Sequence, residues 1–217
     1  MNETTARTLT ATDWIRIFLD IKDAIEANKD RLNELDGAAG DGDHGITMSI
    51  GFRAVCQAFD SLGDDPAIDQ VFTIAGRSFL AASGGAIGPL IGTMWTDAGK
   101  ALAGHPRFGA AECRDLLERM ENAVVRRGHA KPGDKTMLDA LHPAVEAVLN
   151  LQGEQSVAEM LDCAARAALK GAHGTAKMVA RVGRSSRLGE RSLGHEDAGA
   201  NSVAIILRAM ADAARTL

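Results

Sequence analysis

Apolar residues recur at the spacing of an α-helix along most of the chain. The first stretch carries five of them on one helical face: Trp14, Ile17, Phe18, Ile21 and Ile25. Thr10 precedes this face, and Asp13 stands three residues after Thr10, which is the pattern of a capping box. The pattern therefore predicts a helix that begins next to Thr10.

Further stretches repeat this helical spacing. They cover residues 48–59, 68–79, 90–95, 113–124, 138–148, 175–182 and 201–217, and a capping box of Ser156 and Glu159 opens one more. Residues 183–199 are polar and are predicted to form a long loop. No segment alternates with a period of two, and no internal repeat is visible. The predicted fold class is all-α, with about eight antiparallel helices in one domain of residues 1–217.

Composition and charge narrow the class of protein. Hydrophobic residues make up 46% and charged residues 24% of the chain, as in a globular protein. Aromatic residues make up only 4%, which favours a core of Leu, Ile, Val, Met and Ala. The net charge of -5 argues against nucleic acid as a partner, because phosphate backbones attract basic surfaces.

The cysteines and the hydropathy pattern indicate the cellular compartment of the protein. Cys56, Cys113 and Cys163 are odd in number and widely spaced, so they form neither a disulfide framework nor a zinc pattern. The polar residues 1–12 carry no signal-peptide core, and no later stretch is apolar enough to span a membrane. We therefore expect a cytoplasmic protein without a membrane partner.

Acidic residues and glycines are concentrated in residues 36–45. Asp36, Asp41, Asp43 and His44 fall within nine positions, interleaved with glycines. Carboxylates this close repel one another, and a hard divalent cation such as magnesium offsets the repulsion. The segment fits a metal site that precedes a helix, where free N–H groups could also meet a phosphate. A solvated Asp/Gly turn is the alternative, whereas a calcium EF-hand loop fails at Ile46 and Phe52.

Three other segments carry candidate chemistry. Residues 83–89 form a Gly-rich turn before a helix, which suits either a phosphate or close helix packing. Residues 128–137 read as a polar interhelical connection. Residues 183–191, continued by 195–199, hold three arginines that suit an anionic ligand. A mobile surface loop or a modest RNA contact is the alternative for this segment, and the acidity of the chain argues against RNA. The chain has neither a Walker A motif nor the protein-kinase motifs.

Together these segments resemble the L subunit, or C-terminal L domain, of dihydroxyacetone kinases. The resemblance covers nearly the whole chain and rests on four motifs in order: Leu35-Asp36 with residues 40–45, residues 83–86 with Gly88-Pro89, residues 131–137, and residues 188–192 with Gly194-His195 and Asp197. It implies an eight-helix antiparallel barrel that binds ADP or ATP at one end. It also implies two Mg²⁺ ions between the phosphates and Asp36, Asp41 and Asp43.

The resemblance assigns further residues to the nucleotide. His44 and Thr47 would lie beside the phosphates, and Ala86 and Ile87 would follow the Ser83-Gly84-Gly85 turn along the nucleotide. Gly128 and Met137 would border the base. Arg184 and Asp197-Ala198-Gly199 would help to cover the ligand.

Two positions depart from the family pattern. Thr47 stands where Asn is expected in many relatives, and Ala198 stands where Pro is often found. Thr keeps a hydroxyl but loses an amide, which puts one phosphate contact in question. The alanine is expected to loosen the cover over the nucleotide.

The resemblance also implies partners. The sugar would be held by a separate K-type subunit, since this chain is too short to hold both parts, and a phosphotransferase-system phosphocarrier protein would renew the bound ADP. A homodimer is a further candidate assembly. The alternatives are the L subunit of a split ATP-dependent kinase for another small ketose or tetrose, a non-catalytic nucleotide-binding regulatory protein, and a magnesium phosphohydrolase.

Overall fold

The computed structural model describes residues 7–38 and 40–217. Residues 1–6 of the predicted domain, with half of the polar segment 1–12, and Ala39 of the acidic segment lie outside the described residues. Within the described part the chain forms helices and no strand. The α-helices are α1 (Ala11–Ala27), α2 (Lys29–Gly37), α3 (His44–Ala58), α4 (Ile68–Ala82), α5 (Ile87–Ala101), α6 (Ala110–Gly128), α7 (Leu138–Leu149), α8 (Val157–Gly174) and α9 (Ala198–Thr216). Three short 3₁₀-helices are η1 (Phe59–Ser61), η2 (Thr175–Lys177) and η3 (Arg184–Ser192).

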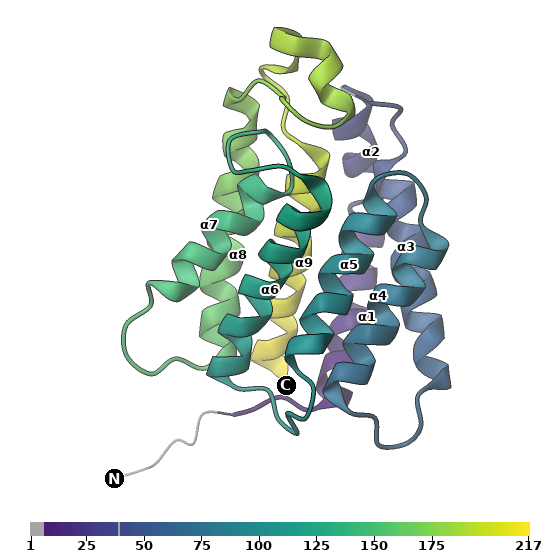
Figure 1. The fold of residues 1–217 in the computed structure, drawn as a ribbon, viewed down its shortest axis with the longest axis vertical. Coiled ribbons are helices and arrows are strands. Elements are labelled where there is room, and N and C mark those ends of the chain that lie inside the picture. The colour runs from purple at the N-terminus through teal and green to yellow at the C-terminus, as the bar shows by residue number, and fades with distance from the viewer. Residues whose placement is uncertain (1–6, 39) are drawn as a thin grey trace.

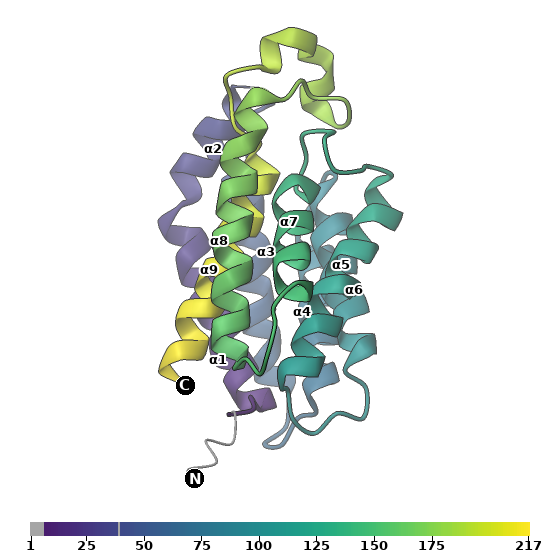
Figure 2. The ribbon, with the colours of Figure 1, turned by 90° about the vertical axis from the view of Figure 1, so that its left-hand side faces the viewer.

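The eight long helices stand side by side and alternate in direction (Figures 1 and 2). Each packs against the next along the chain, with α1 against α3, and α9 returns to pack against α1. The helices therefore close into a ring, and the short α2 extends α1 beyond a break at Asn28. The all-α prediction with eight long helices is confirmed. Among the described residues, no helix combines the length and the apolar character needed to cross a membrane.

Capping and burial explain why the predicted segments form helices. Thr10 and Asp13 form the expected capping box of α1, and Ser156 and Glu159 form that of α8. The apolar face predicted for α1 is fully buried. Since a helix gains most of its stability in a protein from packing such a face, these segments fold together with the core.

Aromatic residues are few, but all eight lie in the core. Trp14 packs edge-on against Phe72 and Phe108, with ring centroids 4.6 and 4.8 Å away. Phe18 meets Trp95 at 4.9 Å. Leu9 pairs with Phe108 through two backbone hydrogen bonds, so the start of the chain is joined to this cluster. The aromatic cluster anchors the end of the ring where α1 begins, and aliphatic residues fill the rest.

Two local predictions near the end of the chain were wrong. Residues 175–182 were expected to be helical, but α8 ends at Gly174 and only the single turn η2 follows. Met178 is extended, with φ -105° and ψ 148°. The predicted loop 183–199 contains η3, and α9 already begins at Ala198. Tertiary contacts of the backbone, described below, override the local helical spacing.

A buried carboxylate joins α8 to α9. The side chain of Asp162 is only 10% exposed and accepts from Arg208 at 2.8 Å. Arg166 and Arg215 pair with the same carboxylate. Three guanidinium groups therefore pair with the carboxylate of Asp162. Asp212 pairs with two of the same arginines, but its side chain is 59% exposed.

We expect Asp162→Asn to lower the free energy of unfolding by about 2 kcal/mol, because charged hydrogen bonds across two helices are lost. Asp212→Asn is the matched control, since it removes an exposed carboxylate from the same arginines and should cost less than about 1 kcal/mol. Urea denaturation of both variants measures the difference. Equal losses would contradict the central role of Asp162.

Candidate functional site

A cavity of about 300 Å³ opens at the end of the ring where α3, α5, α7 and α9 begin. It gathers four segments that are far apart in the sequence. Of the residues named from the sequence, those that line it are Asp36, Asp41, Asp43, His44, Thr47, Gly84, Gly85, Ala86, Ile87, Met137, Arg184, Asp197, Ala198 and Gly199. Ser83 and Gly128 are not among the lining residues.

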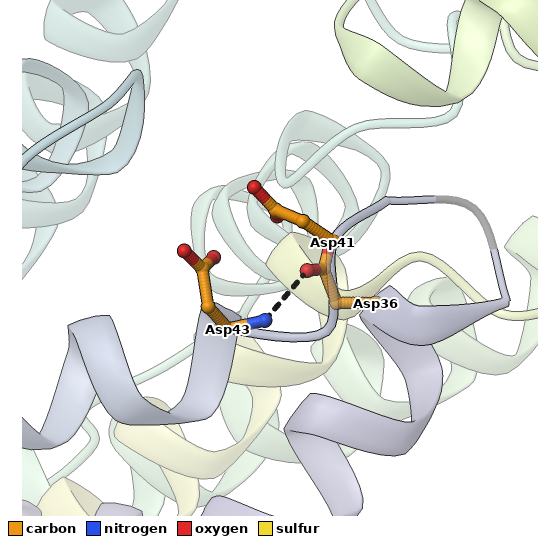
Figure 3. A group of neighbouring side chains, drawn as sticks. All are labelled: Asp36, Asp41 and Asp43. Carbon is orange, nitrogen blue, oxygen red and sulfur yellow. Dashed lines mark hydrogen bonds between the residues drawn. The ribbon is translucent and has the colours of Figure 1, made fainter.

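The acidic segment wraps around Asp36, the penultimate residue of α2 (Figure 3). One carboxylate oxygen of Asp36 accepts from the backbone N–H of Gly42 at 2.9 Å and from that of Asp43 at 3.2 Å. These bonds curl the loop so that Asp36, Asp41 and Asp43 each offer an oxygen, all within 4.8 Å of one another. Three carboxylate oxygens in this arrangement fit a hard divalent cation.

The pKa values of the Asp41 and Asp43 carboxyls shift in opposite directions. Withdrawal from water raises the pKa of the Asp41 carboxyl, but its own backbone amide and the paired Arg184 guanidinium outweigh this and leave the pKa below its ordinary value. The pKa of Asp43 is raised, by withdrawal from water and by the charge of Asp41. The cluster thus carries mutual repulsion that a cation relieves.

Glycines allow this loop and the start of α3 to pack closely. A Cβ at Gly40 would lie 2.5 Å from a carboxylate oxygen of Asp36. Gly42 has φ +76°, a conformation that side chains disfavour. A Cβ at Gly45 would lie 2.0 Å from the backbone oxygen of Lys29, so only glycine lets α3 begin against α2.

His44, the first residue of α3, is held neutral. Burial lowers the pKa of its imidazole to about 4, and the charge of Asp36 opposes this only in part. Its Nε2 lies 2.7 Å from Ser202 Oγ, and that hydroxyl donates to the carbonyl of Ala198. Since the imidazole is neutral, one of its ring nitrogens carries a proton and the other keeps a lone pair.

The Gly-rich turn lies between α4 and α5. Gly85 has φ +63°, and the turn leads directly into α5 at Ile87. Ser83 is buried and donates its hydroxyl to the carbonyl of Thr47 at 3.2 Å. Ser83 therefore ties the turn to α3 and does not line the cavity. Gly128, at the end of α6, lies behind Leu90, which itself lines the cavity.

Buried acids fasten the connection before α7, and Asp139 is the one next to the cavity wall. Asp139 accepts from the backbone N–H groups of Gly133 at 2.6 Å and Thr136 at 2.8 Å. This places Thr136 and Met137 on the cavity wall. Lys135, next to them, is buried and lines the cavity as well.

The start of α9 forms the remaining wall. Asp197 caps the helix by accepting from the N–H of Ala200 at 2.8 Å, and burial raises its pKa to about 6. Its own N–H donates to the buried Thr175 hydroxyl at 2.8 Å. Ala198 is the first helical residue, the position at which proline is well tolerated, so either residue fits there.

Several lining residues were missed from the sequence: Leu35, Leu90, Lys135, Thr136, Val182, Gly183, Ser185, His195 and Glu196. Leu35, Lys135, Thr136 and His195 belong to the four motifs, so their position in those motifs was an available signal. The apolar Leu90 and Val182 carried no such signal, because local sequence does not show which apolar residues face a cavity.

Comparison with known proteins gives a consistent result. The family described as the DAK2 domain matches residues 38–212. The chain is 36% identical over 209 residues to the "PEP-dependent dihydroxyacetone kinase, ADP-binding subunit DhaL" of Escherichia coli, and the match covers 95% of this chain and 99% of that protein. A Listeria innocua protein of the corresponding name is 37% identical, over 86% of this chain and 87% of its own length.

Longer proteins also match. The "L-erythrulose 1-kinase" of Mycolicibacterium smegmatis is 36% identical over 85% of this chain, which spans only 32% of that protein. The crystal structure of dihydroxyacetone kinase from C. freundii in complex with AMP-PNP and Mg²⁺ matches with a TM-score of 0.70 and 24% identity. It covers 98% of this chain and 36% of that one, and it supports the same fold.

We expect Gly45→Ala to lower the free energy of unfolding by about 2 kcal/mol, because the added methyl group meets the Lys29 carbonyl and the backbone must shift. Gly63→Ala is the control, since nothing lies within 4 Å of a Cβ there. Thermal and urea denaturation compare the two. If the two variants are equally stable, the close approach of α3 to α2 is wrong.

Proposed function

This chain belongs to the DAK2-domain family, and from that premise we propose that it is the nucleotide-binding subunit of a dihydroxyacetone kinase. It is a kinase subunit that works within a complex of several subunits. The observation that carries the proposal is the similarity over nearly the full length of both chains to DhaL subunits, together with three aspartates gathered where four helices begin. We take residues 1–217 as one nucleotide-binding domain.

Asp36, Asp41 and Asp43 are proposed to hold magnesium. Their carboxylate oxygens match the preference of this ion, and the backbone N–H groups of Gly42 and Asp43 fix Asp36 in place. Magnesium, when bound, supplies charge neutralisation and polarisation of the phosphoryl group that is transferred. Three carboxylates with two oxygens each can be shared between the two ions expected from the family.

The nucleotide phosphates are proposed to lie against the N-termini of α3, α5 and α9. Free N–H groups and the positive ends of the helix dipoles favour an anion there. Thr47 and Gly84 to Ala86 line this side of the cavity. Ile87, Leu90 and Met137 give the apolar wall that suits a base.

The residues of this chain bind and orient the nucleotide, and the acceptor sugar comes from elsewhere. Arg184 lies across the cavity mouth beside Asp41, where its guanidinium can meet phosphate oxygens. His44 is buried and neutral, so it adds no positive charge. We propose that a K-type subunit brings dihydroxyacetone to this opening.

The proposed phosphoryl source is a phosphotransferase-system phosphocarrier protein that renews bound ADP. Support comes from the relatives that match along most of their own length, which are named PEP-dependent or PTS-dependent kinases. The erythrulose kinases, by contrast, match with about a third of their length. A cytoplasmic location is part of the proposal and is supported by three free cysteines.

Replacing Asp43 with Asn should weaken magnesium-dependent ADP binding by about 100-fold or more, because loss of a ligand costs at least as much as loss of an outer-shell partner. Asp41→Ala should abolish retention of the nucleotide. Asp64→Asn is the control, because Asp64 is an exposed acid between η1 and α4 that does not line the cavity, and this variant should bind ADP like wild type. Isothermal titration with Mg²⁺ and ADP measures all three, and wild-type affinity in the Asp43 variant would remove this carboxylate from the site.

Reconstitution distinguishes the candidate functions. The chain alone should phosphorylate no dihydroxyacetone, and turnover should appear when a K-type subunit and a phosphorylated carrier protein are added. The purified chain should keep near-stoichiometric ADP after dialysis with magnesium.

Three other outcomes of this reconstitution would assign a different function to the chain. Turnover with ATP and no carrier protein would make it a split ATP-dependent kinase. Phosphate release from ATP without sugar would make it a phosphohydrolase. Bound ADP without turnover in the complete mixture would leave a regulatory role.

A further inference from the structure

Lys135 is an unusual residue in the connection before α7. It is only 3% exposed, although lysine is seldom buried. Its φ is +62°, a left-handed conformation that costs free energy for a residue with a side chain. Burial lowers the pKa of its ammonium group, with the charge of Asp197 acting the other way. Strain and burial together require strong contacts to hold this side chain.

The contacts of Lys135 are two backbone carbonyls. Its Nζ donates to the carbonyl oxygen of Met178 at 3.1 Å and to that of Ser192. Met178 directly follows η2, and Ser192 ends η3. The two acceptors therefore mark the two ends of residues 178–192, which we call the cover segment. In Figure 1 it forms part of the light-green region above the ends of the helices.

Other hydrogen bonds lie near the same two ends of the cover segment. Ala180 N–H donates to Ser192 Oγ at 2.9 Å, and Arg181 N–H donates to the Asp134 carbonyl at 3.1 Å. Gly194 N–H donates to the Ala176 carbonyl at 2.8 Å. The ammonium group of Lys135 is the only charged group in this set, and it is the one side chain that joins both ends of the cover segment to the α7 connection.

We propose that Lys135 is a positioning residue for the kinase reaction: its ammonium group fastens both ends of the cover segment and so holds Arg184 over the cavity. The inference rests on the proposed function, since Arg184 is taken to face the nucleotide. Lys135 acts through the segment, and its Nζ is directed at carbonyls. Loss of the ammonium group leaves two carbonyls without a donor, which is costly where they are buried.

The first test measures the cover segment without nucleotide. Lys135→Met keeps the stem and removes the donor, and Lys177→Met is the matched control at an exposed lysine in η2. Hydrogen exchange at the amides of Ala180, Arg181 and Gly194 should become at least about tenfold faster in Lys135→Met, because a charged hydrogen bond of this kind contributes about that factor or more. Trypsin should cut faster after the exposed Arg184, Arg187 and Arg191.

The second test measures nucleotide release. The dissociation rate of Mg²⁺–ADP should rise about tenfold in Lys135→Met with little change in the association rate, because the cover opens more often. Lys177→Met should match wild type in both. Lys135→Gln, which retains an N–H donor, should lie between the two.

Three outcomes would overturn the inference. Unchanged exchange in the cover segment means that Lys135 does not fasten it. Faster nucleotide release without faster exchange means that Lys135 contacts the nucleotide directly. Faster exchange with unchanged release means that the segment does not cover the site.

Two controls keep the tests decisive. If wild-type protein binds no Mg²⁺–ADP, the proposed function fails and the release test fails with it, while the exchange test still decides whether Lys135 fastens the segment. If Lys135→Met does not fold, Lys135→Gln is used in both tests. In that variant, hydrogen exchange and nucleotide release that are both the same as in wild type would count against the inference.

Discussion

Antiparallel packing places the beginnings of α3, α5, α7 and α9 at one end of the ring. The first N–H groups of each helix have no partner within the helix, and the helix dipole adds partial positive charge at the same place. Three aspartates stand at this end and repel one another. The end therefore favours a ligand with both signs of charge, and a phosphate chain with its metal ions has this property. Fold and proposed function are linked through this constraint, because the topology alone brings together the helix N-termini that the proposed site offers to an anion.

Sequence patterns predicted the helices well where local signals agreed with packing. The capping boxes at Thr10 and Ser156 and the apolar face of α1 are cases in which one short segment contains its own signal. The helix expected at 175–182 is the opposite case. The Met178 carbonyl is taken by Lys135, which lies 43 residues earlier, and the chain becomes extended there. Such a contact cannot be inferred from spacing within the segment.

The same distinction applies to the site. The acidic segment, the Gly-rich turn and the start of α9 were identifiable because their residue types are rare in combination, and the structure gathers them around one cavity. Ser83 of the Gly-rich turn and Gly128, at the start of the connection to α7, lie behind the wall. The Ser83 hydroxyl donates to the Thr47 carbonyl, and the end of α6 at Gly128 packs on Leu90. Motifs thus predicted which segments line the cavity, whereas the direction in which each side chain points depended on packing.

The first turn of α1 and the last turn of α9 lie at the end of the ring opposite the cavity (Figure 1). Both ends of the described chain are therefore remote from the cavity. A linker attached at either of them can lead to another domain without crossing the cavity mouth or disturbing the loops that form it. The same helical ring can thus serve as a free subunit or as one part of a longer polypeptide, and the lengths of the matched relatives include both arrangements.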